Sequence, residues 1–318
     1  MSAVSWRSPS RIICCVLIRY SLYLVLGYAP AAMSGTIVRI STSIGDYSIE
    51  LLDDMAPVTV QNFLNYVNRN DYNGTYIHRA VDNFVVQGGG FRFREFEGPI
   101  DIPSDPPIQN EFGVSNTRGT VAMAKLDGDP DSATNQWFVN VTDNSASLDA
   151  SNGGFTVFGT VLGDGMIIVD AIDALPTVEL GVKASSAPYI TPQYTDPRDF
   201  LYINAEVTKR FSSAPHLFES ATGLLITSVS IDSGASLISL NFNVAATAPN
   251  IVIRANAESA IPRKDTFEGI AEYSTIDGRL RFPSLEVNAN GSISVVTNVV
   301  FVLTDLATAS FTLESFDQ

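Results

Sequence analysis

Cysteine and histidine are almost absent from this chain of 318 residues: it has Cys14, Cys15, His78 and His216 and no others. Zinc and copper sites are usually built from several cysteine and histidine ligands, so such a site is not expected. The sequence also lacks a Gly-x-Ser-x-Gly elbow, and two histidines leave few bases for a serine triad. The glycines at 88–90 have no neighbouring lysine of a phosphate-binding loop, which argues against nucleotide binding.

Basic residues are scarce as well. The formal net charge is -15, with a pI near 4.4, so the chain should repel nucleic acid and anionic membrane surfaces. The composition is 45% hydrophobic and 17% charged, as in a folded protein. These numbers favour a folded, globular chain.

Alternating acidic residues suggest a calcium-binding loop, but the rest of the segment does not match the sequence pattern of such a loop. Asp127, Asp129 and Asp131 stand at alternate positions, but the sixth place holds Ser132 and the twelfth holds Phe138. A calcium loop of this kind needs glycine and glutamate there. We therefore expect a polar loop and no metal.

The N-terminus has the pattern of an export signal. Arg7 and Arg11 precede an apolar run, and Ala29-Pro30-Ala31 offers small residues for cleavage. We predict a signal peptide at residues 1–33, hence a periplasmic or secreted protein that is not inserted in the membrane after cleavage. Cleavage would remove both cysteines and leave no disulfide. Arg19 interrupts the apolar run, so a retained membrane anchor is the alternative.

Two domains are expected from the length and the change of pattern along the chain. Residues 34–210 combine short alternating runs with two helical patterns, one starting at Pro57 and one within "GMIIVDAIDAL". After a linker at 211–216, residues 217–318 show only strand-like alternation, which predicts a β-sandwich-like domain of about seven strands. The chain should thus be mainly β.

The run "YIHRAVDNFVVQGGG" at 76–90 places Arg79 before an apolar stretch that ends at Gln87. Such a charge usually marks only the solvent side of a strand. Here the pattern also fits an apolar surface with a hydrogen-bond donor at each end. The run, followed by "NEFGVSNTRGTVAMAK", "DSATNQWFVNV" and "FTVFGTVLGDGM", resembles the cyclophilins, the cyclophilin-type peptidyl-prolyl cis-trans isomerases, in particular those exported by bacteria. The resemblance spans about residues 36–208 and implies an eight-stranded closed β-barrel capped by two helices.

The resemblance also implies a site for proline. Its catalytic residues would be Arg79, Phe84 and Gln87, and its substrate-binding residues Val85, Ala124, Lys125, Gln136, Phe138, Leu148 and Phe155. The chain departs from the common pattern at four of the positions around the site: Val85 replaces a common Met, Lys125 a common Asn, Ser147 an aromatic residue, and Phe155 a common His. The loss of the aromatic residue at 147 argues against strong cyclosporin binding.

The implied reaction is rotation about X-Pro peptide bonds without a cofactor, in proline-containing peptides and unfolded exported proteins. Arg79 would act as the donor to the twisted amide. One alternative is a non-catalytic module that holds proline-containing peptides and is targeted by its second domain. Another is that the second domain binds glycan, a surface or a protein partner.

Overall fold

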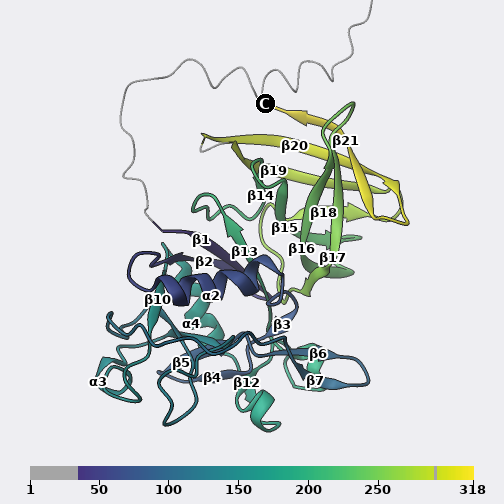
Figure 1. Cartoon of the computed structure of the whole chain (residues 1–318). Coiled ribbons are helices and arrows are strands. Elements are labelled where there is room, and N and C mark those ends of the chain that lie inside the picture. The colour runs from purple at the N-terminus through teal and green to yellow at the C-terminus, as the bar shows by residue number, and fades with distance from the viewer. Residues whose placement is uncertain (1–34, 290–291) are drawn as a thin grey trace, which may run out of the picture.

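The computed structural model describes residues 35–289 and 292–318. The predicted signal peptide, with both cysteines, lies outside the described residues. Figure 1 shows two β-rich bodies, one from purple to teal and one from green to yellow. None of the helices in the described part is long and apolar enough to cross a membrane.

The first body holds all the helices of the described residues. Its strands are β1 (Ile37–Thr42), β2 (Gly45–Leu51), β3 (Thr75–Tyr76), β4 (Arg79–Val81), β5 (Val85–Gly88), β6 (Phe91–Arg94), β7 (Gly98–Asp101), β8 (Thr120–Met123), β9 (Trp137–Asn140), β10 (Val157–Val161), β11 (Thr177–Val178), β12 (Ala187–Pro188) and β13 (Tyr202–Thr208). Its helices are α2 (Pro57–Asn68), α3 (Ser145–Leu148), α4 (Gly165–Asp173), η2 (Val182–Ala184) and η3 (Pro197–Asp199).

The main sheet of this body closes on itself. Its strand order is β4-β5-β9-β8-β10-β2-β1-β13-β3-β6-β7. Since β3 runs directly into β4, this one segment pairs with β13 on one side and with β5 on the other. Taken as a single strand, it completes an eight-stranded barrel, to which β6 and β7 add a hairpin. The predicted cyclophilin-like barrel is confirmed.

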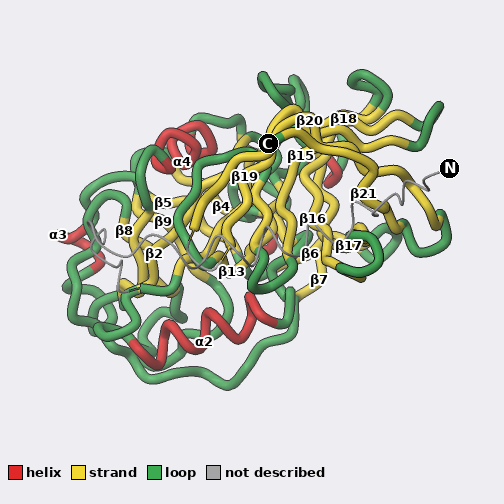
Figure 2. Tube along the Cα trace, turned by 90° about the horizontal axis from the view of Figure 1, so that it is seen from above, coloured by secondary structure: helices red, strands yellow, loops and turns green. Residues whose placement is uncertain are grey.

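Two helices pack on the barrel, as predicted. Pro57 occupies the first turn of α2, where its missing N–H costs nothing, and Val60, Phe63 and Val67 face the core. The Phe63 ring lies 6.1 Å from Trp137 and 4.9 Å from Phe158. Figure 2 shows α2 and α4 on opposite sides of the strands.

The second body is all β. Its strands are β14 (Leu217–Glu219), β15 (Leu224–Ile231), β16 (Ser236–Ala246), β17 (Val252–Pro262), β18 (Ala271–Ser274), β19 (Arg279–Ala289), β20 (Ser292–Asp305) and β21 (Ser310–Asp317). The additional β-domain is therefore confirmed. Its pairing also forms a closed circuit, because β14 and β18 each pair with both β15 and β19.

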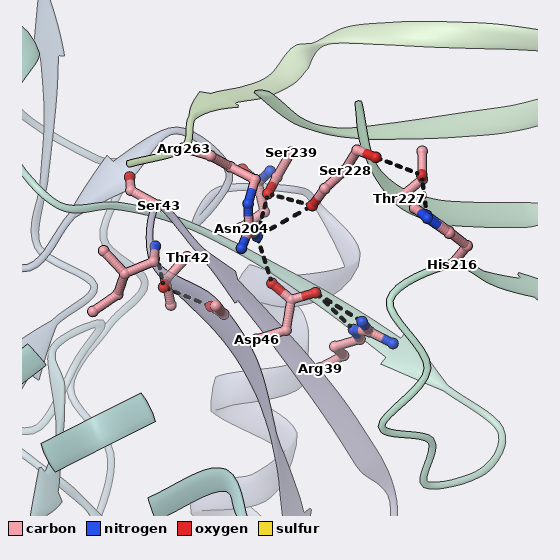
Figure 3. A network of polar contacts seen from close by, with 12 residues as sticks. Arg39, Thr42, Ser43, Asp46, Asn204, His216, Thr227, Ser228, Ser239 and Arg263 are labelled. Carbon is pink, nitrogen blue, oxygen red and sulfur yellow. Dashed lines mark hydrogen bonds and ion pairs between the residues drawn. The ribbon is translucent and has the colours of Figure 1, made fainter. Parts of the chain in front are cut away.

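A buried charged group joins the two bodies (Figure 3). Asp46 lies in the hairpin β1–β2 and accepts a hydrogen bond from Arg39 at 2.7 Å. Its other oxygen lies 3.8 Å from Arg263 of the second body. Arg263 also donates to Ser228 at 3.1 Å and to Ser239 at 3.3 Å. Burial lowers the pKa of Arg263, and the Asp46 carboxylate partly opposes this.

Further polar contacts cross the same interface. The Lys264 amide donates to the Ser43 carbonyl at 2.7 Å. The Glu206 carboxylate on β13 accepts from Asn73 at 2.9 Å and from Asn241 of the second body at 2.7 Å. Burial raises the pKa of Glu206, and the two amide donors lower it. The second body is thus attached through buried groups on β1, β2 and β13.

We expect Asp46→Asn to lower the free energy of unfolding by about 3 kcal/mol, because it leaves two buried arginine charges without their carboxylate. Urea denaturation at neutral pH measures this loss. Asp170→Asn is the matched control, since Asp170 pairs with Arg118 where both side chains are about half exposed. Equal losses of unfolding free energy in the two variants would show that the buried Asp46 contributes no more than an exposed ion pair.

Candidate active site

The residues predicted for the site lie on the outer face of the first barrel. Side chains alternate along a strand, so Val86 and Val139 join the inner core while Val85 and Phe138 face outward. The register pairs Gln87 with Phe138, and thereby places a polar side chain next to an aromatic ring.

An apolar cluster covers this outer face. Its buried members are Val85, Ala122, Phe138, Leu148 and Val157, and its half-buried members are Leu52, Phe84, Val114, Ala124 and Phe155. The Phe138 and Phe155 rings meet edge to face at 5.9 Å. All six apolar residues predicted for the site, including Ala124, belong to this cluster. We refer to it below as the outer pocket.

A row of polar side chains borders the outer pocket. Arg79 on β4 donates from Nη1 to Gln87 Oε1 at 3.2 Å, and Gln87 Nε2 donates to Gln136 Oε1 at 2.9 Å. The Arg79 guanidinium also lies 5.6 Å from the centre of the Phe84 ring. Burial lowers the pKa of Arg79, which nonetheless stays charged. The structure therefore brings Arg79, Gln87 and Gln136 together at one edge of the apolar surface.

Lys125 lies beside Phe155 of the outer pocket. Its Nζ donates to the carbonyls of Asn152 at 2.8 Å and Gly154 at 2.7 Å, and it lies 4.9 Å from the centre of the Phe155 ring. Burial lowers the pKa of Lys125. Lys125 is among the residues predicted to bind substrate; in the structure its side chain is tied to the loop that carries Phe155.

The glycine run allows close packing behind the row of polar residues. Gly89 has φ +84°, and a Cβ there would lie 2.6 Å from the Asn135 carbonyl and 2.8 Å from Trp137. A Cβ on Gly90 would lie 2.8 Å from the Gln136 amide nitrogen. A side chain at 89 would collide with the main chain and the core, so glycine is required there, whereas a side chain at 90 would displace the Gln136 side chain from its place beside Gln87.

Two further positions complete the description of the pocket. Ser147, which stands where an aromatic residue is common, is exposed at the end of α3, so α3 presents Leu148 to the pocket instead. Val114 also lies in the pocket, and the sequence analysis missed it. Its only signal in the sequence is its place in "NEFGVSNTRG", where Phe112 and Val114 are the large apolar residues.

His78 lies next to Arg79 in the sequence and is buried. It is 2% exposed, and its ring packs edge to face on Phe91 at 4.8 Å. Burial, together with the charge of Arg79, lowers the pKa of His78 to about 4. Within the described ranges, no three His, Cys, Asp or Glu side chains are grouped so that they could hold a metal ion.

Comparison with known proteins gives one consistent family. Residues 37–191 match the family model "Cyclophilin type peptidyl-prolyl cis-trans isomerase/CLD". The chain is 43% identical over 154 residues to the peptidyl-prolyl cis-trans isomerase of Acinetobacter baylyi, covering 48% of this chain and 79% of that protein. It is 42% identical over 151 residues to peptidyl-prolyl cis-trans isomerase B of Escherichia coli, covering 46% and 88%.

Among solved structures, a cyclophilin type peptidyl-prolyl cis-trans isomerase of Cryptosporidium parvum aligns with a TM-score of 0.42 at 20% identity. The alignment covers 56% of this chain and 99% of that one. The region that matches the family model, residues 37–191, contains every residue predicted for the site.

We expect the buried, neutral His78 to make the protein sensitive to acid. Its pKa is about 4 when folded and about 6.5 when unfolded, so the unfolded state binds the extra proton first. Its contribution to stability is complete above pH 6.5 and falls as the pH drops toward 4. Between pH 7 and 5, wild type should lose about 2 kcal/mol more than His78→Gln in urea denaturation.

The same expectation can be checked directly by following the His78 ring signals by NMR. Titration of His78 near pH 6.5 in the folded protein would contradict it. The difference between wild type and His78→Gln isolates this histidine, because all other titrating groups are shared.

Proposed function

Because the chain belongs to the cyclophilin-type peptidyl-prolyl cis-trans isomerases, we propose that its outer pocket binds the proline of an X-Pro bond and catalyses rotation about that bond. One observation supports this most directly. A half-buried guanidinium, hydrogen-bonded to Gln87, lies beside Phe84 of the apolar cluster on the outer face of the barrel.

The reaction requires no covalent step. Rotation about an X-Pro bond is slow because it breaks amide resonance, with a barrier of roughly 18–20 kcal/mol. An acceleration of about 10⁵-fold requires roughly 7 kcal/mol of binding that is stronger in the twisted state than in the planar state. The catalyst therefore needs a firm hold on one side of the bond and a donor that prefers the twisted amide.

The outer pocket has parts suited to both tasks. Phe84, Phe138 and Leu148 would hold the pyrrolidine ring, so that the segment before it rotates. In the twisted amide the proline nitrogen regains a lone pair that can accept a hydrogen bond. In the planar ground state this lone pair is delocalised by amide resonance. Arg79 would donate toward this nitrogen and the proline carbonyl, because its fork of N–H groups stays charged and fixed. Gln87 keeps that fork in place through its 3.2 Å hydrogen bond.

We expect Arg79→Ala to lower kcat/KM for an Ala-Pro-Phe peptide by about 10²- to 10³-fold, as for loss of one transition-state donor. Arg79→Lys should recover little, since an ammonium lacks the planar fork. Cis-trans exchange by NMR measures the rate. Arg94→Ala is the control: its side chain, on β6, is 57% exposed and should not affect exchange.

A peptide-binding module is the alternative function, and the same experiment separates the two. Folded wild-type protein that binds the peptide without accelerating exchange would exclude the isomerase activity in this chain and support the binding module. Unchanged exchange in Arg79→Ala would remove Arg79 from the mechanism.

We further propose that the substrates are exported proteins during their folding, and that the protein acts outside the cytoplasm. The support is the N-terminal pattern, with Arg7 and Arg11 before an apolar run and small residues at 29–31. An isomerase at this location would meet chains before their X-Pro bonds reach the native isomer, a step that takes tens of seconds or more without a catalyst.

Export predicts a shortened protein. After expression of the full chain in a bacterial host, N-terminal sequencing of the periplasmic or secreted protein should start near residues 32–34. A membrane-bound product that still begins at residue 1 would contradict cleavage and favour the anchor.

A further inference from the structure

Three buried asparagines lie behind the outer pocket and are not part of it. They are Asn116, in the loop before β8, Asn140, at the end of β9, and Asn144, before α3. Their side chains are hydrogen-bonded to one another, and their residues are exposed by 0%, 0% and 6%. We call them the asparagine network.

One end of the network holds the Phe84 side of the pocket. Asn144 Nδ2 donates to the Phe84 carbonyl at 2.8 Å and to Asn140 Oδ1 at 2.8 Å. The Asn144 carbonyl also accepts from the Leu148 amide at 2.9 Å, which fixes α3 to the same point. Residue 144 thus contacts both walls, the Phe84 wall through the asparagine side chain and α3 through its own main chain.

The other end holds the Phe155 side. Asn140 Nδ2 donates to Asn116 Oδ1 at 3.2 Å, and Asn116 Nδ2 donates to the Phe155 carbonyl at 2.9 Å. Asn116 also donates to Asp149 Oδ1, from its side chain at 3.0 Å and from its main chain at 2.9 Å. Since Asp149 directly follows Leu148, this contact fixes α3 from its far end.

From these contacts we propose that Asn116, Asn140 and Asn144 are positioning residues, which set the distance between the Phe84, Leu148 and Phe155 walls of the proline pocket. This inference rests on the proposed isomerase function of the same pocket. The three walls come from separate segments, the turn at 82–84, α3 with Asp149, and the loop at 152–155, and the network connects all three by side-chain hydrogen bonds.

The direction of the hydrogen bonds requires a side chain at 140 that can both donate and accept. In each link an amide nitrogen donates to a carbonyl, so Asn140 must accept from Asn144 and donate to Asn116. Asn140 Nδ2 is also bound to Thr120 Oγ1 at 2.9 Å, which fixes its orientation. An apolar or acidic side chain cannot both donate and accept in this way.

The test compares Asn144→Ala, Asn144→Ser and Asn140→Ala with wild type, at a temperature where all are folded. The Phe84 carbonyl keeps the main-chain N–H of Val141 at 3.1 Å, so loss of Asn144 need not unfold the strand. We expect KM for the Ala-Pro-Phe peptide to rise about tenfold and kcat to change less than about threefold, because Arg79 is held by Gln87 and not by the network.

The NMR signals of the Phe84 and Phe155 rings provide a second measurement, which does not depend on enzymatic activity. Asn140 donates to neither residue, so a shift of both signals in Asn140→Ala would show that the network transmits position. Asn241→Ala is the matched control: Asn241 is also buried, at 2% exposure, and donates to Glu206 between the two bodies. It should lower the unfolding midpoint without moving KM or the ring signals.

The proposal is overturned if the network variants lose stability as Asn241→Ala does and keep wild-type KM and ring signals. A wild-type protein that does not accelerate exchange at all would instead refute the proposed function. In that case peptide affinity and the ring signals still decide whether the network positions the pocket.

Discussion

The alternation of side chains along β5 and β9 is the constraint on which the site depends. The same two strands supply Val86 and Val139 to the inner core and Val85 and Phe138 to the outer pocket. A slip of one residue in either strand would exchange the two faces. Closure of the barrel prevents such a slip, since β5 is held by β4 on one side and β9 on the other. The pocket is therefore as well defined as the core, although it lies on the surface.

A pocket on an outer face lacks the dense packing that shapes a core on every side. Its remaining walls come from loops, and loops are normally the mobile part of a fold. Here side-chain hydrogen bonds replace packing: Lys125 ties the loop at 152–154, and the asparagine network ties Phe84 to Phe155. The polar groups around the site thus divide into two sets. Arg79, Gln87 and Gln136 border the pocket directly, whereas the buried asparagines bind the carbonyls of Phe84 and Phe155 and the carboxylate of Asp149.

The sequence predicted the parts of this structure that are local or carried by motifs. The spacing of Val60, Phe63 and Val67 predicts α2, and the order of the motifs predicts the barrel. The hydrogen bonds of Asn116, Asn140 and Asn144 could not be predicted in this way, because asparagine in a loop usually indicates only a turn. Nor could alternation in the second body show that β14 and β18 each bridge β15 and β19. Pairing between distant strands leaves no pattern within either strand.

The interface between the two bodies is likewise formed by residues that are distant in sequence. Arg39, Asp46 and Arg263 are distant in sequence and buried together, and Glu206 accepts hydrogen bonds from both bodies. Separating the two bodies would break these contacts. The second body is therefore held against the β1 and β13 side of the first barrel. In Figure 1 this side is turned away from β4, β5 and α3, which carry the pocket. The second body therefore lies away from the elements that carry the outer pocket.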